Sequence, residues 1–108
     1  MSNRYREYIT KEVTEEAFYN DPRPYVRALI HYDTTDKHDP TLVSRETVVG
    51  CFSNFWRAEY VFKYRQTLLV QQLNDMYNHR FVSNVSLERA PLFMNFEDID
   101  YVDLRAIE

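Results

Sequence analysis

The feature that most constrains the fold is a run of 26 residues, 53–78, that contains neither glycine nor proline. Placed at 100° steps, its apolar residues fall in one arc of about 140°, which is typical of the core-facing stripe of an amphipathic helix. The stripe consists of Phe55, Ala58, Val61, Phe62, Leu68, Leu69, Leu73 and Met76. The spacing therefore predicts one long helix over residues 53–78.

The apolar residues beyond position 79 alternate instead, and this pattern predicts strands at residues 80–88 and 98–105, joined by a loop that contains Pro91. Residues 25–32 suit a helix or a strand, and we favour the strand because they are rich in aromatic and β-branched residues. Residues 33–41 read as a polar loop, and residues 10–18 as a short N-terminal helix. The expected fold is α+β, with one long central helix packed against a small antiparallel sheet.

The chain has 108 residues and a single glycine, so no flexible linker divides it, and we expect residues 1–108 to form a single domain. A phosphate-binding loop of the P-loop or Rossmann kind needs several glycines close together. One glycine excludes both kinds of nucleotide site.

The net charge of −4 arises entirely in the last eighteen residues, because residues 1–90 carry equal numbers of acidic and basic side chains. Such a balance argues against a general nucleic-acid binder, which needs clustered lysine and arginine. Cys51 is the sole cysteine, so no intramolecular disulfide can form, and its apolar neighbours place it in the core. With no signal peptide or membrane span in the sequence, we expect a cytoplasmic protein without membrane contact.

Three histidines raise the question of a metal or general-base site, formed by His31, Asp33, His38 and His79. The spacing lacks any pair that would hold a metal on one helix face. Turns collect such residues for backbone reasons, so we interpret them as solvated loop residues. We expect no cofactor and no catalytic activity.

Two polar residues, Arg65 and Gln72, fall inside the apolar arc of the predicted helix. A buried guanidinium needs acceptors, which the carboxylates of Asp98, Asp100 or Asp103 would supply. The alternative is a groove that admits another molecule. We favour the internal ion pair.

The opposite face of this helix carries Trp56, Tyr60 and Tyr64 at intervals of four, beside Arg57 and Lys63. Side chains four apart are neighbours on a helix, so the rings form a continuous row. Either the rest of the fold covers this row, or it is a partner surface, because tryptophan, tyrosine and arginine concentrate in interface hot spots. Stacking of single-stranded bases is a weaker reading, given the neutral charge of residues 1–90.

The leading hypothesis is a small non-catalytic interaction protein, an adaptor, inhibitor or assembly component, that binds another protein or a second copy of itself. Its expected partner-binding residues are Trp56, Arg57, Tyr60, Lys63, Tyr64, Asp98, Asp100 and Asp103. The alternatives are an acidic mimic of nucleic acid that inhibits a DNA- or RNA-handling protein, and a small metal-assisted hydrolase.

Overall fold

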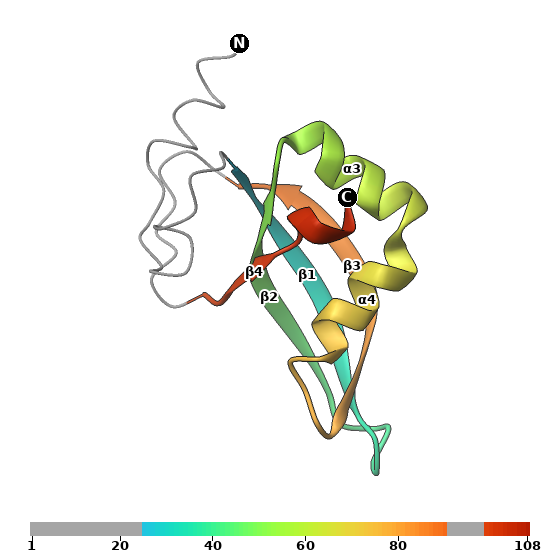
Figure 1. The fold of residues 1–108 in the computed structure, drawn as a ribbon. Helices are drawn as coiled ribbons and strands as arrows, with labels where there is room; N and C mark the ends of the chain where they lie inside the picture. Colours follow the sequence, from blue (N-terminus) through green and yellow to red (C-terminus); the bar gives the residue numbers. More distant parts are fainter. Residues whose placement is uncertain (1–24, 91–98) are drawn as a thin grey trace.

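A computed structural model describes residues 25–90 and 99–108 of the chain. In chain order these residues form β1 (Val26–Asp36), β2 (Val43–Phe52), α3 (Phe55–Tyr64), α4 (Gln66–Asn74), β3 (Arg80–Arg89), β4 (Tyr101–Asp103) and the 3-10 helix η1 (Arg105–Ile107). The strands make one sheet in the order β3-β1-β2-β4, and the helices lie over one of its faces (Figure 1). The α+β class therefore holds, but the architecture differs from the prediction in two respects.

The first correction concerns the sheet, which is mixed and not antiparallel. The long central strand β1 pairs antiparallel with both β2 and β3, whereas β4 pairs parallel with β2, with Val49 opposite Tyr101. β4 lies at the edge opposite β3 and runs in the same direction as β3. Alternation in a sequence reveals a strand but carries no information on its direction, so this pairing was not predictable.

The second correction concerns the long helix, which is two short helices that meet at Arg65. The backbone of Arg65 has φ −131° and ψ 30°, outside the helical region. Its N–H still donates to the carbonyl of Val61, and its carbonyl accepts from the N–H of Leu69, so the break costs few hydrogen bonds. The prediction was wrong because a straight helix of 26 residues would be about 39 Å long, and two shorter helices can follow the sheet more closely.

The break leaves most of the predicted apolar stripe facing the core. The buried residues are Phe55, Ala58 and Val61 in α3 and Leu69 and Leu73 in α4, and all five belong to that stripe. Two further members of the predicted stripe, Leu68 and Met76, are exposed. Gln72 is exposed as well, so it needs no buried partner.

The strand preference for residues 25–32 and the strand predicted at residues 80–88 are confirmed by β1 and β3. The polar loop predicted for residues 33–41 begins later, because Asp33 and Asp36 continue β1 between two neighbouring strands. The strand predicted for residues 98–105 is confined to β4 and is followed by η1, and residue 98 lies outside the described residues. So does the predicted helix at residues 10–18.

β2 has no counterpart among the predicted elements, because its first half is exposed and only its second half is buried. It contains Gly50, the one glycine of the chain. A Cβ added there would lie 2.6 Å from Cδ1 of Ile30 and 3.1 Å from Cδ1 of Leu104. The glycine therefore allows β1, β2 and the chain after β4 to pack closely.

The main core lies between the sheet and the helices. β1 and β2 contribute buried residues that include Ile30 and Phe52, and α3 and α4 contribute Val61 and Leu73. The opposite sheet face holds a smaller cluster around Leu29 and Val49. Among the described residues, no helix is both long and apolar enough to cross a membrane.

Candidate functional site

Helix α3 begins at a well-defined cap. The side chain of Asn54 accepts a hydrogen bond of 2.8 Å from the N–H of Arg57, which satisfies one of the donors that a helix start leaves without a partner. From there Phe55, Ala58 and Val61 face the sheet and are buried. Because a helix repeats every 3.6 residues, this anchoring turns positions 56, 60 and 64 away from the core.

These outward positions carry Trp56, Tyr60 and Tyr64, which we call the aromatic strip. Trp56 and Tyr60 are stacked, with ring centroids 6.1 Å apart and planes 23° from parallel. Tyr60 and Tyr64 follow with centroids 5.2 Å apart. Trp56 is 64% exposed and Tyr64 is 68% exposed, so the fold does not cover the two ends of the strip.

Three cations lie over the rings of the strip. The guanidinium of Arg57 is 5.2 Å from the ring of Trp56 and 5.8 Å from that of Tyr60, within the range of cation–π attraction. Lys63 lies 5.9 Å from the ring of Tyr64, and Arg65 lies 5.6 Å from that of Tyr60. In the part of the chain that the structure describes, none of the three cations forms an ion pair with a carboxylate.

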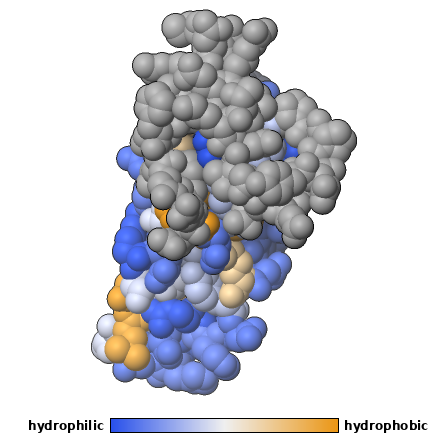
Figure 2. Space-filling view, turned by 90° about the vertical axis from the view of Figure 1, so that its left-hand side faces the viewer, coloured by the Kyte–Doolittle hydropathy of each residue, from blue (hydrophilic) through white to orange (hydrophobic). Residues whose placement is uncertain are grey.

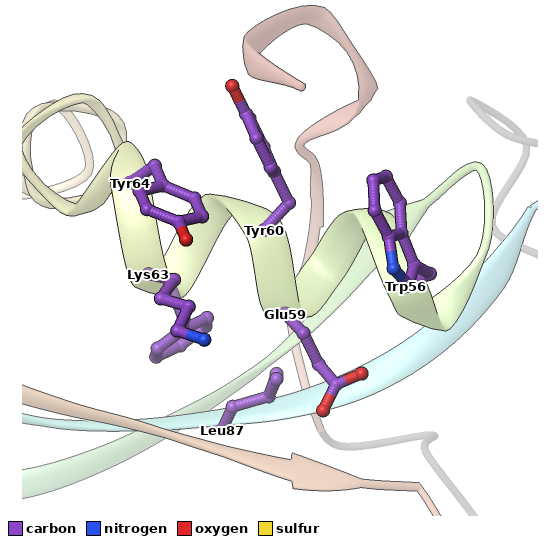
Figure 3. A pocket seen from close by; sticks show the side chains of 7 residues that line it. Trp56, Glu59, Tyr60, Lys63, Tyr64 and Leu87 are labelled. Carbon is purple, nitrogen blue, oxygen red and sulfur yellow. The ribbon is translucent and has the colours of Figure 1, made fainter.

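An open pocket of about 600 Å³ adjoins the strip on the side of β3 (Figure 3). Its lining consists of Trp56, Glu59, Tyr60, Phe62, Lys63, Tyr64 and Leu87. Glu59 and Lys63 extend from α3 toward the side on which Leu87 lies (Figure 3). The pocket thus combines an apolar wall with one anionic and one cationic side chain.

Neither Asp100 nor Asp103 lines this pocket. β4 is at the edge opposite β3, although the chain after it returns to the start of α3, where Oε1 of Glu108 accepts from the N–H of Ser53 (Figure 1). Asp103 forms a bidentate pair with the buried Arg105, with Nε–Oδ1 and Nη2–Oδ2 distances of 2.9 Å. Asp100 is exposed, and Asp98 lies outside the described residues.

This arrangement corrects the expected partner of Arg65. A buried arginine does pair with a C-terminal carboxylate, but the arginine is Arg105, two residues from Asp103. Arg65 instead lies on the ring of Tyr60 at the junction of α3 and α4, and its Nε is buried without a hydrogen-bond partner. The non-helical backbone at Arg65, which the sequence did not reveal, removes it from the predicted apolar arc.

The residues considered for metal chemistry are dispersed. His31 lies on the sheet face opposite the helices, where Nδ1 is 2.7 Å from Oγ1 of Thr47 and Nε2 is 3.1 Å from Oε1 of Glu88. His38 is at the β1–β2 turn, and His79 precedes β3. Within residues 25–90 and 99–108, no three histidine, cysteine, aspartate or glutamate side chains are placed to hold a metal ion.

The same sheet face carries a second set of polar contacts around Arg45. Its guanidinium donates to Oδ1 of Asp33, to the carbonyl of Asn84 and to Oγ of Ser86, over 2.9–3.1 Å. The amide of Asn84 also donates to Oδ2 of Asp33. The hydrogen bond from Asn84, followed by that from Arg45, lowers the pKa of the Asp33 carboxyl. These donors and acceptors satisfy one another, so this group of side chains offers a ligand few unsatisfied hydrogen-bond donors or acceptors.

Cys51 is fully buried, which confirms its predicted place in the core. Burial raises the pKa of its thiol far above the ordinary range, so the nucleophilic thiolate is suppressed. The Cys51 side chain therefore acts as a small core residue that packs with Tyr25 and Tyr101.

The sequence did not reveal a second apolar patch, at the far end of the sheet. Leu42, Val43 and Phe81 are each more than half exposed, and Thr35 of β1 lies between the latter two across the sheet. Figure 2 shows apolar surface among polar residues at the lower end of the molecule, where the β1–β2 turn lies in Figure 1. The sequence of residues 80–88 did contain an indication of this patch. Phe81 and Val82 are adjacent in one strand, so their side chains point to opposite faces of the sheet and only Val82 is buried.

No protein-family model, curated protein or solved structure matches this chain. The function must therefore be argued from the chemistry of its own surfaces. Among those described, the aromatic strip is the surface that combines exposed rings, unpaired cations and an adjoining pocket.

Proposed function

We propose that this protein is a small non-catalytic interaction module that docks a protein partner on the aromatic strip of α3. The single observation that carries the proposal is the exposure of Trp56 and Tyr64, at 64% and 68%, although both are large rings on a helix that is otherwise well anchored. Contiguous exposed apolar surface of this kind marks interaction sites in soluble proteins.

The size of the strip suits this role. A tryptophan or tyrosine side chain buries about 150–250 Å² when it is fully covered. Because Trp56 and Tyr64 are about two-thirds exposed and Tyr60 is partly buried, the three rings supply roughly 250–400 Å². A standard interface buries about 800 Å² on each partner, most of its energy coming from a few central aromatic and arginine residues. The strip and its cations would form the centre of such an interface.

Two further parts of the proposal rest on the sequence. The lone buried Cys51 and the lack of any possible intramolecular disulfide support a cytoplasmic setting. We keep Asp98 and Asp100 as a secondary contact region and leave out Asp103, because Asp103 is engaged by Arg105. For the same reason the nucleic-acid mimic has less support, and the dispersed histidines weaken the metal-assisted hydrolase.

The test compares three forms of the full chain as bait in lysate of the source cells, with bound proteins quantified by mass spectrometry. The wild type should enrich a partner that the Trp56→Ser/Tyr64→Ser variant loses at least about 30-fold, the equivalent of one hot spot of 2 kcal/mol. The matched control, Leu42→Ser/Val43→Ser, removes exposed apolar side chains from the far end of the sheet and should retain the partner. Equal capture by all three forms would contradict the proposal.

A further inference from the structure

We propose that the segment docked on the aromatic strip is acidic, with carboxylates on both sides of one apolar anchor residue that enters the adjoining pocket. This inference rests on the proposed function and names the chemistry of the partner. It follows from the charge, the spacing and the lining of the site.

The charge argument begins with the cations that no neighbour neutralises. Arg57, Lys63 and Arg65 all lie over rings of the strip, and none forms an ion pair with a carboxylate among the described residues. Glu59 is the one acidic residue of the pocket lining. A local excess of positive charge on a chain whose net charge is −4 favours a partner segment of opposite sign.

The spacing of the cations sets the length of the segment. On the helical wheel Arg57 and Lys63 fall on opposite flanks of the strip, and six residues of helix separate them by about 9 Å along the axis. An extended peptide rises about 3.3–3.6 Å per residue. Carboxylates two to four positions apart would therefore reach both cations while the residues between them cross the rings.

The lining of the pocket requires the apolar anchor. Phe62 and Leu87 supply apolar walls to a pocket of about 600 Å³, which is large enough for a leucine or an aromatic side chain. A wholly acidic segment would leave these walls in water. A segment that alternates carboxylates with one large apolar residue satisfies both kinds of surface.

The same strip could attract single-stranded nucleic acid, since aromatic rings beside cations stack bases. The carboxylate of Glu59 within the lining would repel the phosphates, and no nucleotide base carries an aliphatic group larger than the methyl of thymine for the wall at Leu87. These two residues favour the peptide.

The experiment pans a random peptide library on phage against the full chain, then titrates the enriched sequences as fluorescent synthetic peptides. We expect enrichment of aspartate or glutamate two to four positions apart around a leucine or an aromatic residue. Affinity should fall about tenfold or more in the Arg57→Gln/Lys63→Gln variant, remain unchanged in Leu42→Ser/Val43→Ser, and weaken as salt rises. Oligothymidylate of similar length is titrated in parallel.

The outcomes separate the two proposals. Enriched peptides without acidic residues, which bind the Arg57→Gln/Lys63→Gln variant as well as the wild type but not Trp56→Ser/Tyr64→Ser, would overturn the acidic segment and leave the docking function intact. Binding of oligothymidylate in preference to every peptide would overturn both. Self-association that is lost in Trp56→Ser/Tyr64→Ser, with no peptide enriched, would replace the acidic segment by a second copy of the chain.

Discussion

The cationic side chains on the two sides of the molecule have opposite surroundings. On the sheet side, Arg45 donates to three acceptors and Arg105 clasps Asp103, so their donors are used within the fold. On the helix side, Arg57 and Lys63 lie on exposed rings and have no carboxylate partner among the described residues. Arg45 and Arg105 therefore stabilise the fold, whereas Arg57 and Lys63 are the cations that we propose bind a partner.

The same contrast holds for side chains other than the arginines and lysines. On the helix-free face of the sheet, His31 bridges Thr47 and Glu88, whereas on α3 the rings of Trp56 and Tyr64 face solvent. Hydrogen bonds made within the fold lower the gain from binding a ligand, since each would have to be exchanged. We therefore propose that the helix-free face stabilises the fold and that the outer face of α3 binds a partner.

The largest expected effect is on the Arg105 pair. The Asp103→Asn variant removes the charge of the bidentate acceptor from a guanidinium that is 3% exposed. We expect a loss of about 3 kcal/mol in the free energy of unfolding, at the low end for buried pairs because Asp103 is partly exposed. Urea unfolding measures the loss. Partner binding by the folded fraction should not change, and a stability loss below about 1 kcal/mol would place this pair with the surface ion pairs.

The next effect concerns Arg45. Replacing it with glutamine removes hydrogen bonds to Asp33, Asn84 and Ser86, but the site is half exposed, so the expected loss is about 1 kcal/mol. The same unfolding experiment measures it. If Arg45→Gln instead abolished partner capture without affecting stability, the division between the two sides would be wrong.

Removal of the helix-side cations should hardly affect stability. The Arg57→Gln/Lys63→Gln variant loses no ion pair of the described residues and only exposed cation–π contacts near the outer limit of their range, so its free energy of unfolding should lie within about 1 kcal/mol of the wild type. Thermal and urea unfolding provide the comparison. A loss of several kcal/mol would mean that these cations hold the fold, as Arg105 does.

The smallest effect is the pH dependence of the Asp33 contacts. Hydrogen bonds from Asn84 and Arg45 lower the pKa of Asp33 below its ordinary 3.8, so its ionised form stabilises the fold above that pH and the contribution is lost as the pH falls through the lowered value. The stability difference between wild type and Asp33→Asn should narrow between pH 6 and pH 2. A difference that stays constant over this range would contradict the assignment.

The elements that the sequence predicted well are those with one dominant pattern. Alternation revealed β1 and β3, and the helical period revealed that residues 53–78 are largely helical. The break at Arg65 has no glycine or proline to mark it, so the local pattern did not predict it. β2 escaped detection because only half of it is buried, and the parallel direction of β4 depends on contacts far apart in the chain.

The candidate site divides in the same way. The row of Trp56, Tyr60 and Tyr64 follows from spacing within one helix, so it was predictable from the sequence. The pocket beside it was not, because Leu87 comes from β3. The ion pair of Arg105 with Asp103 was not predicted, because it depends on the turn that leads from β4 into η1.

The most direct test of the account uses Trp56, the only tryptophan of the chain, as its own reporter. Acrylamide quenching of its fluorescence is measured on the monomer, with light scattering to establish its state, and again with a saturating captured partner or selected peptide. We expect strong quenching in the free protein and marked protection in the complex. A tryptophan already shielded in the monomer, or one quenched equally in both, would show that the aromatic strip is not the docking surface.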